Sequence, residues 1–146
     1  MIGGFYYIRY KIEAQTGLAM GTLRTMATSQ AQYQSCAQTD QDCDGTGEFG
    51  LLGELAGTIP RRGGYGLPLG MPANPTFITP VLGPQNRDPW GIKSGYHFQV
   101  FLTGKKRCTT DKGTQNPVSL GHDEEENAII NVQETKYRAY AWPISG

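Results

Sequence analysis

The sequence lacks an excess of charge of either sign. It has 13 lysine and arginine residues against 13 aspartate and glutamate residues, so its formal net charge is zero. A nucleic-acid-binding domain typically carries a basic excess or a basic stripe, and the densest basic run here is the short segment 105–107. The charge balance therefore argues against a nucleic-acid partner and against electrostatic attraction to an anionic membrane surface.

Long apolar runs and catalytic motifs are also missing. No segment approaches the roughly 18 consecutive apolar residues of a membrane-spanning helix, so we expect no membrane span in this chain. There is no G-x-S-x-G nucleophile elbow, and the glycine-rich segment Arg61–Gly66 lacks the lysine of a phosphate-binding loop. Nothing in the sequence positions His97 or His122 beside a nucleophile. We therefore predict that the protein is not an enzyme.

Cysteine is scarce, with three residues at Cys36, Cys43 and Cys108. No C-x-x-C pair occurs, which excludes zinc-ribbon and thioredoxin-like sites. In an oxidising compartment Cys36 and Cys43 are close enough in sequence to close a small loop. Cys108 could compete for either partner, and the odd count leaves one thiol free or shared between chains. The sequence leaves the pairing open.

Glycine and proline are plentiful, at 20 and 9 of the 146 residues, which predicts one loop-rich domain. The segment Leu18–Gln34 has no proline and predicts a helix, which we extend upstream to about Ile8. Residues 1–35 then form a helix and assembly segment, and residues 36–146 form a globular head. The predicted packing face of the helix consists of residues at steps of three and four: Met20, Leu23, Met26, Ala27, Gln30, Ala31 and Gln34.

The second half of the chain has the alternation of strands. Residues 95–103 and 137–142 alternate between two faces and predict antiparallel strands, while residues 128–132 suggest a third, short strand. Residues 57–95 are rich in proline and glycine but contain apolar anchors, so we expect them to wrap the head. The predicted fold is α+β, with an N-terminal helix packed on a small antiparallel sheet and a long Pro/Gly-rich loop region.

An acidic loop is the most specific chemical signal. Asp40, Asp42 and Asp44 alternate and Gly45 follows, which matches the opening of a calcium-binding loop. Glu48 could add a fourth carboxylate, and such hard oxygen ligands suit Ca²⁺ better than zinc. The acid that closes an EF-hand loop is missing, so a solvated Asp-Gly turn is the alternative interpretation.

Four segments, in order, resemble bacterial type IV pilin-like proteins and type II secretion pseudopilins. Gly21–Tyr33 resembles the run that follows the membrane-spanning part of their N-terminal helix. Asp40–Gly50 resembles their D-x-D-x-D-G-x-G-E-F-G loop, Lys93–Phe98 their K-S-G-Y-x-F strand, and Tyr140–Ser145 their Y-A-W-P strand. These segments cover about half of the chain. The hydrophobic N-terminal helix of the family is lacking, because residues 6–11 are too short and too charged to span a bilayer.

The resemblance implies a structural subunit that self-assembles into an extracellular filament, pseudopilus or tube at the cell surface. Its partners would be identical subunits, and other pilin-like subunits are a further expectation. A calcium ion in a surface loop also accords with this family. The aromatic N-terminus and the helix face would carry the subunit contacts; the residues concerned are Phe5, Tyr6, Tyr7, Tyr10, Met20, Leu23, Met26 and Ala27.

A second function from another class fits the same sequence. It is a monomeric, calcium-dependent surface binding or adhesion module. Trp90, Trp142 and the tyrosines would then form an exposed aromatic platform. The size of the protein in solution distinguishes the two hypotheses. The first predicts a polymer, and the second predicts a monomer of about 16 kDa.

Overall fold

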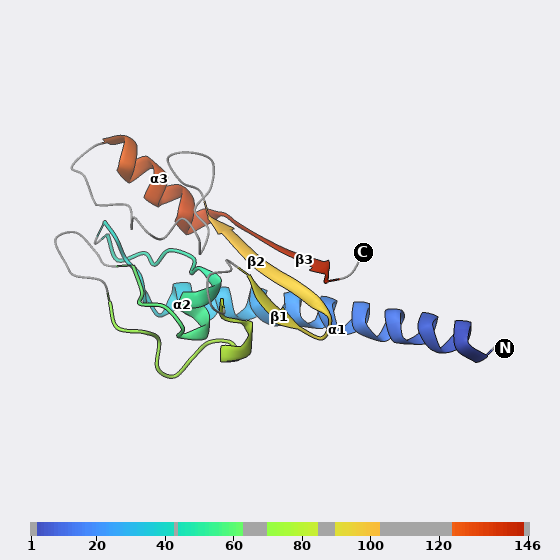
Figure 1. Cartoon of the computed structure of the whole chain (residues 1–146). Helices are drawn as coiled ribbons and strands as arrows, with labels where there is room; N and C mark the ends of the chain where they lie inside the picture. The colour runs from blue at the N-terminus through green and yellow to red at the C-terminus, as the bar shows by residue number, and fades with distance from the viewer. Residues whose placement is uncertain (1–2, 43, 63–69, 85–89, 103–123, 145–146) are drawn as a thin grey trace.

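The computed structural model describes residues 3–42, 44–62, 70–84, 90–102 and 124–144. The fold class is α+β, as predicted: a long N-terminal helix lies beside a head that contains a small antiparallel sheet (Figure 1). In chain order the elements are α1 (Gly3–Ser35), α2 (Leu52–Ala56), the 3₁₀ turn η1 (Pro80–Leu82), β1 (Gly91–Lys93), β2 (Tyr96–Leu102), α3 (Glu124–Thr135) and β3 (Tyr137–Pro143).

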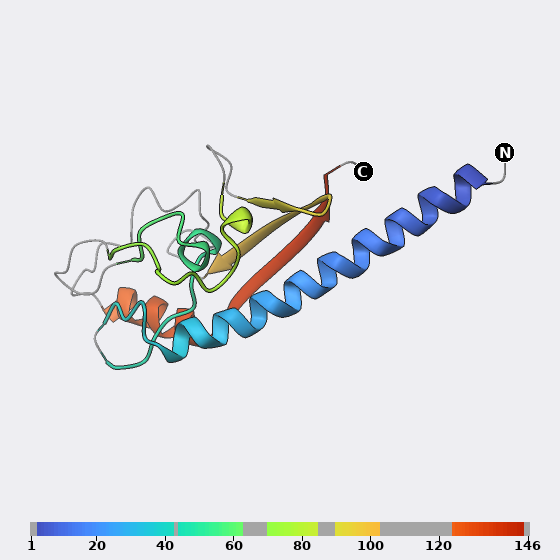
Figure 2. The ribbon, with the colours of Figure 1, turned by 90° about the horizontal axis from the view of Figure 1, so that it is seen from below.

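Only the C-terminal half of α1 packs on the head. Its N-terminal half projects beyond the sheet, as Figures 1 and 2 both show. We call residues 3–18 of α1 the stem; from residue 6 to residue 18 every side chain except Gln15 is exposed. The buried residues of α1 recur at helical spacing on one face: Ala19, Thr22, Met26, Ser29, Gln30 and Tyr33.

The predicted packing face of α1 was wrong in part. Met20, Ala27 and Ala31 are exposed, whereas Thr22 and Ser29, which lie outside the predicted face, are buried. Apolar periodicity alone misplaced the face, because the buried stripe contains hydroxyl groups that find partners inside the molecule. Thr22 donates a hydrogen bond to the Leu18 carbonyl at 2.9 Å.

Ser29 and Gln30 fix the helix to the irregular part of the head. The Ser29 hydroxyl donates to the Phe77 carbonyl at 2.8 Å. The amide side chain of Gln30 donates to the Gly50 carbonyl at 2.7 Å and accepts from the Gly50 N–H at 2.8 Å. The backbone of these loop residues does not pair with a neighbouring strand. The side chains of Ser29 and Gln30 therefore provide the hydrogen bonds that the buried backbone groups would otherwise lack.

The sheet has the order β1-β2-β3, and both pairs of strands are antiparallel. The two strands predicted from alternation are confirmed as β2 and β3. Phe98, Val100 and Leu102 of β2 are buried in the main core, as their shared face predicted. Opposite Val100 lies the small residue Ala139 of β3, which packs against the same core.

The predicted strand at residues 128–132 was wrong, because these residues belong to α3. Ile130 and Gln133, three residues apart, are both buried, which is helical rather than strand spacing. The run of apolar residues was too short for its periodicity to distinguish the two structures. Strand β1 was not predicted from the sequence.

Replacing Gly21 with alanine is expected to raise the free energy of unfolding by about 0.5–1 kcal/mol. A Cβ at this exposed helical position would meet no atom within 4 Å. Gly47→Ala is the contrasting variant, since its Cβ would lie 2.4 Å from the Gln34 carbonyl oxygen and should destabilise. Urea denaturation of both variants measures the effects. A Gly21→Ala variant that loses as much stability as Gly47→Ala would contradict the open surroundings of Gly21 on the helix.

Candidate cation site

The acidic loop curls back beside the end of α1. The Glu48 N–H donates to the Thr39 carbonyl at 2.9 Å, which closes the loop at its base. Inside it, Asp40 accepts from the Gly45 N–H at 3.1 Å. Gly45 has φ +92°, a left-handed conformation that glycine adopts without strain. The predicted Asp-Gly turn is therefore present, and it bends the chain so that its carboxylates can converge.

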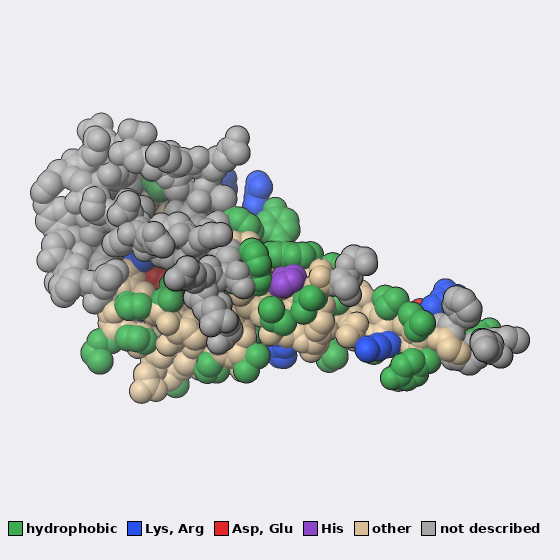
Figure 3. Space-filling view, viewed as in Figure 1, with side chains coloured by type: hydrophobic (Ala, Val, Ile, Leu, Met, Phe, Trp, Pro, Cys, Tyr) green, Lys and Arg blue, Asp and Glu red, His purple; other side chains and the backbone are tan. Residues whose placement is uncertain are grey.

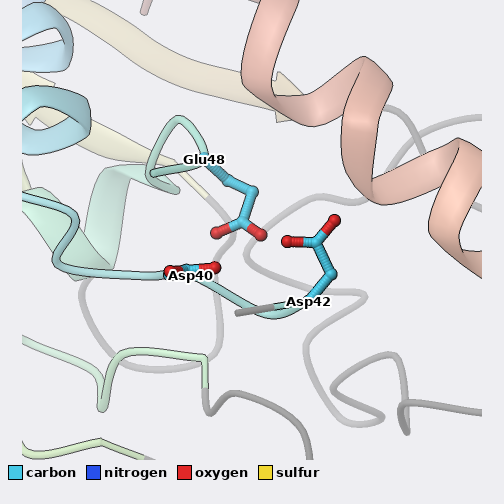
Figure 4. A group of neighbouring side chains, drawn as sticks. All are labelled: Asp40, Asp42 and Glu48. Atoms are coloured by element: carbon cyan, nitrogen blue, oxygen red, sulfur yellow. The ribbon is translucent and has the colours of Figure 1, made fainter. Parts of the chain in front are cut away.

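Three of the four predicted ligands come together. Each of Asp40, Asp42 and Glu48 offers a carboxylate oxygen, and these oxygens lie within 4.8 Å of one another. Figure 4 shows the Glu48 carboxylate directed toward the two aspartates. The two aspartates are half-buried, whereas Glu48 is 0% exposed. A solvated surface turn does not account for a fully buried acid in this position.

The hydrogen bonding of Glu48 is incomplete. Its Oε1 accepts from the Gln41 N–H at 2.7 Å, while its Oε2 is buried and has no partner among the described residues. Asp40 Oδ1 and Asp42 Oδ1 are in the same condition. Burial raises the pKa of Glu48 to about 7. A buried, half-satisfied carboxylate is costly, and a cation would satisfy the three orphaned oxygens together.

A second group extends the site onto α3. Asp42, Asp44 and Glu134 also bring ligand oxygens within 4.8 Å of one another, so Asp44, the fourth predicted ligand, belongs to this group. Burial raises the pKa of both Asp42 and Glu134, and the neighbouring aspartates add to the effect. The sequence analysis missed Glu134, because it is remote along the chain and no local motif connects it to the loop.

These two groups could hold a metal ion, and their chemistry limits which one. Carboxylate oxygens are hard ligands that favour Ca²⁺, Mg²⁺ or Mn²⁺ over the softer transition metals. The position at which an EF-hand would place its last acid is Leu51, which is fully buried in the core. The loop is thus not an EF-hand, and the fifth acid beside it, Glu134, lies on α3.

The site rests on a buried polar network that the sequence analysis also missed. Glu54 of α2 and Arg62 form an ion pair, with Nε 3.0 Å from Oε1 and both side chains buried. Arg62 also donates to Gln133 Oε1 of α3 at 2.6 Å and to the Phe49 carbonyl at 2.5 Å. Arg62, which belongs to the glycine-rich segment Arg61–Gly66, therefore joins α2, α3 and the end of the acidic loop.

The residues predicted to carry subunit contacts divide into two groups. Tyr6, Tyr7, Tyr10 and Met20 are 69%, 69%, 72% and 52% exposed, and Ala27 is exposed as well. Met26 is 0% exposed and Leu23 packs against the same core, so these two are core residues, and the prediction is corrected for them. The Phe5 side chain lies outside the described part of the structure.

The aromatic residues of the alternative hypothesis form a cluster on the outer sheet face. The rings of Trp90 and Trp142 meet edge to face at 6.1 Å, and the His97 ring stacks on Trp142 at 5.4 Å. All three are half-buried. Trp90 and Trp142 are therefore less exposed than the alternative hypothesis expected. His122, Cys43 and Cys108 lie outside the described residues, and Cys36 is an exposed free thiol.

A comparison of the chain with protein-family models, curated proteins and solved structures finds no match. Within the described ranges, no helix combines the length and the apolar character that are needed to cross a bilayer. The function must therefore be inferred from the chemistry and geometry of the chain's own residues.

Proposed function

We propose that this protein is a structural subunit that self-assembles into an extracytoplasmic filament, pseudopilus or tube through its stem. The observation that carries the proposal is the exposed apolar surface of the stem (Figure 3). Of the exposed large apolar side chains of the described chain, six lie on the stem: Tyr6, Tyr7, Ile8, Tyr10, Ile12 and Leu18. An isolated helix with this surface is poorly stable in water, since most helical stability comes from packing.

The stem also continues the packing face of the rest of α1. Stepping back from Met26 by alternate intervals of four and three leads through Thr22, Ala19 and Gln15 to Ile12 and then Ile8. The head covers this seam as far as Gln15, which is half-buried, and leaves Ile12 and Ile8 54% and 56% exposed. A seam that repeats every seven residues is typical of helices that pack against a partner along their length.

A second copy of the chain is the occupant that best fits the stem. Every copy carries the same exposed seam, and its covered half shows that it packs against a surface of this very fold. A contact between the stem of one copy and a different surface of the next is heterologous, and a heterologous contact that does not close produces an open helical array. This geometry supports a filament more than a closed dimer.

We further propose that the cation is Ca²⁺ and that its role is structural. The described acids of the loop offer carboxylate oxygens, and Ca²⁺ accepts six to eight oxygen ligands in flexible geometry. Extracellular modules bind Ca²⁺ with dissociation constants of about 10⁻⁴–10⁻³ M, which suits an extracytoplasmic subunit. The ion would stabilise the head that presents the stem.

Replacing Ile8 and Ile12 of the seam together with serine is expected to abolish assembly of the full chain. These side chains supply several kcal/mol of apolar burial per contact, at about 25 cal/mol per Å². The matched control replaces two exposed apolar side chains of the head, Val81 and Ile92 at 59% and 45% exposure, with serine. Negative-stain electron microscopy and sedimentation velocity measure the assembly.

The wild-type chain and the head control should form polymers, and the stem variant should remain monomeric. Polymers that persist in the stem variant would contradict a contact through Ile8 and Ile12. A wild-type chain that is monomeric at all concentrations, with and without calcium, would overturn the proposed assembly and favour the alternative, a monomeric calcium-dependent binding module.

A further inference from the structure

Among the described residues, helix α3 contributes few side chains to the buried part of the protein. Of its described side chains, Ile130 and Gln133 are buried, yet Ile130 stands apart from the main hydrophobic cluster. Polar contacts make the closest connections: Gln133 meets Arg62, its carbonyl accepts from the Phe49 N–H at 3.1 Å, and the Glu134 carbonyl accepts from the Gln34 side chain. Among the described residues, the contacts that join α3 to the neighbouring loops are therefore mainly polar.

Glu134 weakens the contact between α3 and the acidic loop when no cation is bound. Glu134 lies with Asp42 and Asp44, and its Oε1 is buried without a partner among the described residues. Like charges at such distances repel, so these carboxylates push α3 away from the loop. Asp42 also belongs to the group that contains the fully buried Glu48, so the two groups of acids adjoin at Asp42.

We infer that Glu134 is a ligand of the cation site and that the bound cation fastens α3 to the acidic loop. This inference rests on the proposed calcium site and adds to it a ligand and a consequence. The cation converts the repulsion between Glu134 and the loop aspartates into a cross-link between two segments that are distant in the sequence. Removal of the cation releases α3 while α1 and the sheet keep their packing.

The independent support for a ligand here is Glu48 rather than the number of acids. Its carboxylate is fully buried and directed toward Asp40 and Asp42 (Figure 4), and Oε2 has no partner among the described residues. Surface acids that merely repel each other would turn toward solvent. Asp42 belongs to both groups and so connects Glu48 with Glu134, because the two oxygens of one carboxylate can face two different neighbours.

Calcium titration of the full chain by isothermal calorimetry tests the inference with Glu134→Gln. Glu13→Gln, an exposed acid of the stem, is the matched control. Loss of a charged ligand is expected to weaken Ca²⁺ binding by about tenfold or more, because charge count tunes the affinity of such sites. The control should bind as the wild type does. Equal affinities of Glu134→Gln and the wild type would overturn the inference while leaving the calcium proposal intact.

Hydrogen exchange separates a ligand from a merely structural residue. In the wild type, Ca²⁺ is expected to slow amide exchange in residues 128–135 by about tenfold, and in Glu134→Gln this protection should be lost. In the presence of chelator the variant should be no less stable than the wild type, because it removes a repulsive charge. Unchanged α3 exchange on adding saturating Ca²⁺ would overturn the cross-link. Absence of Ca²⁺ binding to every variant, wild type included, would overturn both the calcium proposal and the inference built on it.

Discussion

Replacing Arg62 with methionine is expected to destabilise the head by about 3–5 kcal/mol, the usual cost of removing one partner of a buried ion pair. The variant leaves Glu54 charged and buried, and it removes the donors to Gln133 and to the Phe49 carbonyl. Domains of this size are stable by about 5–15 kcal/mol, so the loss is a large share of the total. Urea denaturation with α-helical circular dichroism measures it.

Arg61 provides the matched control for this variant. It precedes Arg62 and is only half-buried, and it donates to the Met71 carbonyl at 2.7 Å and to Gln38. Arg61→Met should cost no more than about 1–1.5 kcal/mol, the worth of ordinary hydrogen bonds. Adding Glu54→Gln to Arg62→Met should recover stability, because glutamine is neutral. Equal losses in Arg61→Met and Arg62→Met would contradict a network centred on Arg62.

The sequence was sufficient for those features that depend on local patterns. Alternation predicted β2 and β3, and the freedom from proline predicted most of α1, although not its start at Gly3. Alternating aspartates and a glycine predicted the acidic loop. In each case neighbouring residues share one face or one turn, so the physical cause of the structure lies within a short stretch of chain.

The features that the sequence did not predict depend on contacts between distant segments. The side chain of Arg62 is buried because Glu54, Gln133 and the Phe49 carbonyl surround it, and no local motif records that arrangement. Glu134 joins the acidic loop only through the position of α3. The buried face of α1 was misplaced for the same reason, since Ser29 is buried by virtue of its bond to the Phe77 carbonyl.

Between pH 4.5 and about pH 7, the stability of the cation-free protein is expected to fall as pH rises. Folding raises the pKa of Glu48 from its usual 4.5 to about 7, so in this interval the folded chain binds more protons than the unfolded chain. The difference of about 2.5 in pKa corresponds to about 3 kcal/mol at neutral pH. The raised pKa values of Asp42 and Glu134 act in the same direction. Denaturation in chelator at a series of pH values measures the slope.

The variant Glu48→Gln tests whether Glu48 causes this dependence of stability on pH. The variant should match the wild type near pH 4.5, where Glu48 is protonated, and should be more stable than the wild type at pH 8 in chelator. Added Ca²⁺ reverses the order at pH 8, because the cation stabilises the ionised carboxylate of the wild type and finds one charged ligand fewer in the variant. A wild-type stability that rises with pH across this interval in chelator would show that Glu48 is ionised and satisfied without a cation. The burial that makes Glu48 costly in the free protein is thus what would make it a strong ligand in the loaded one.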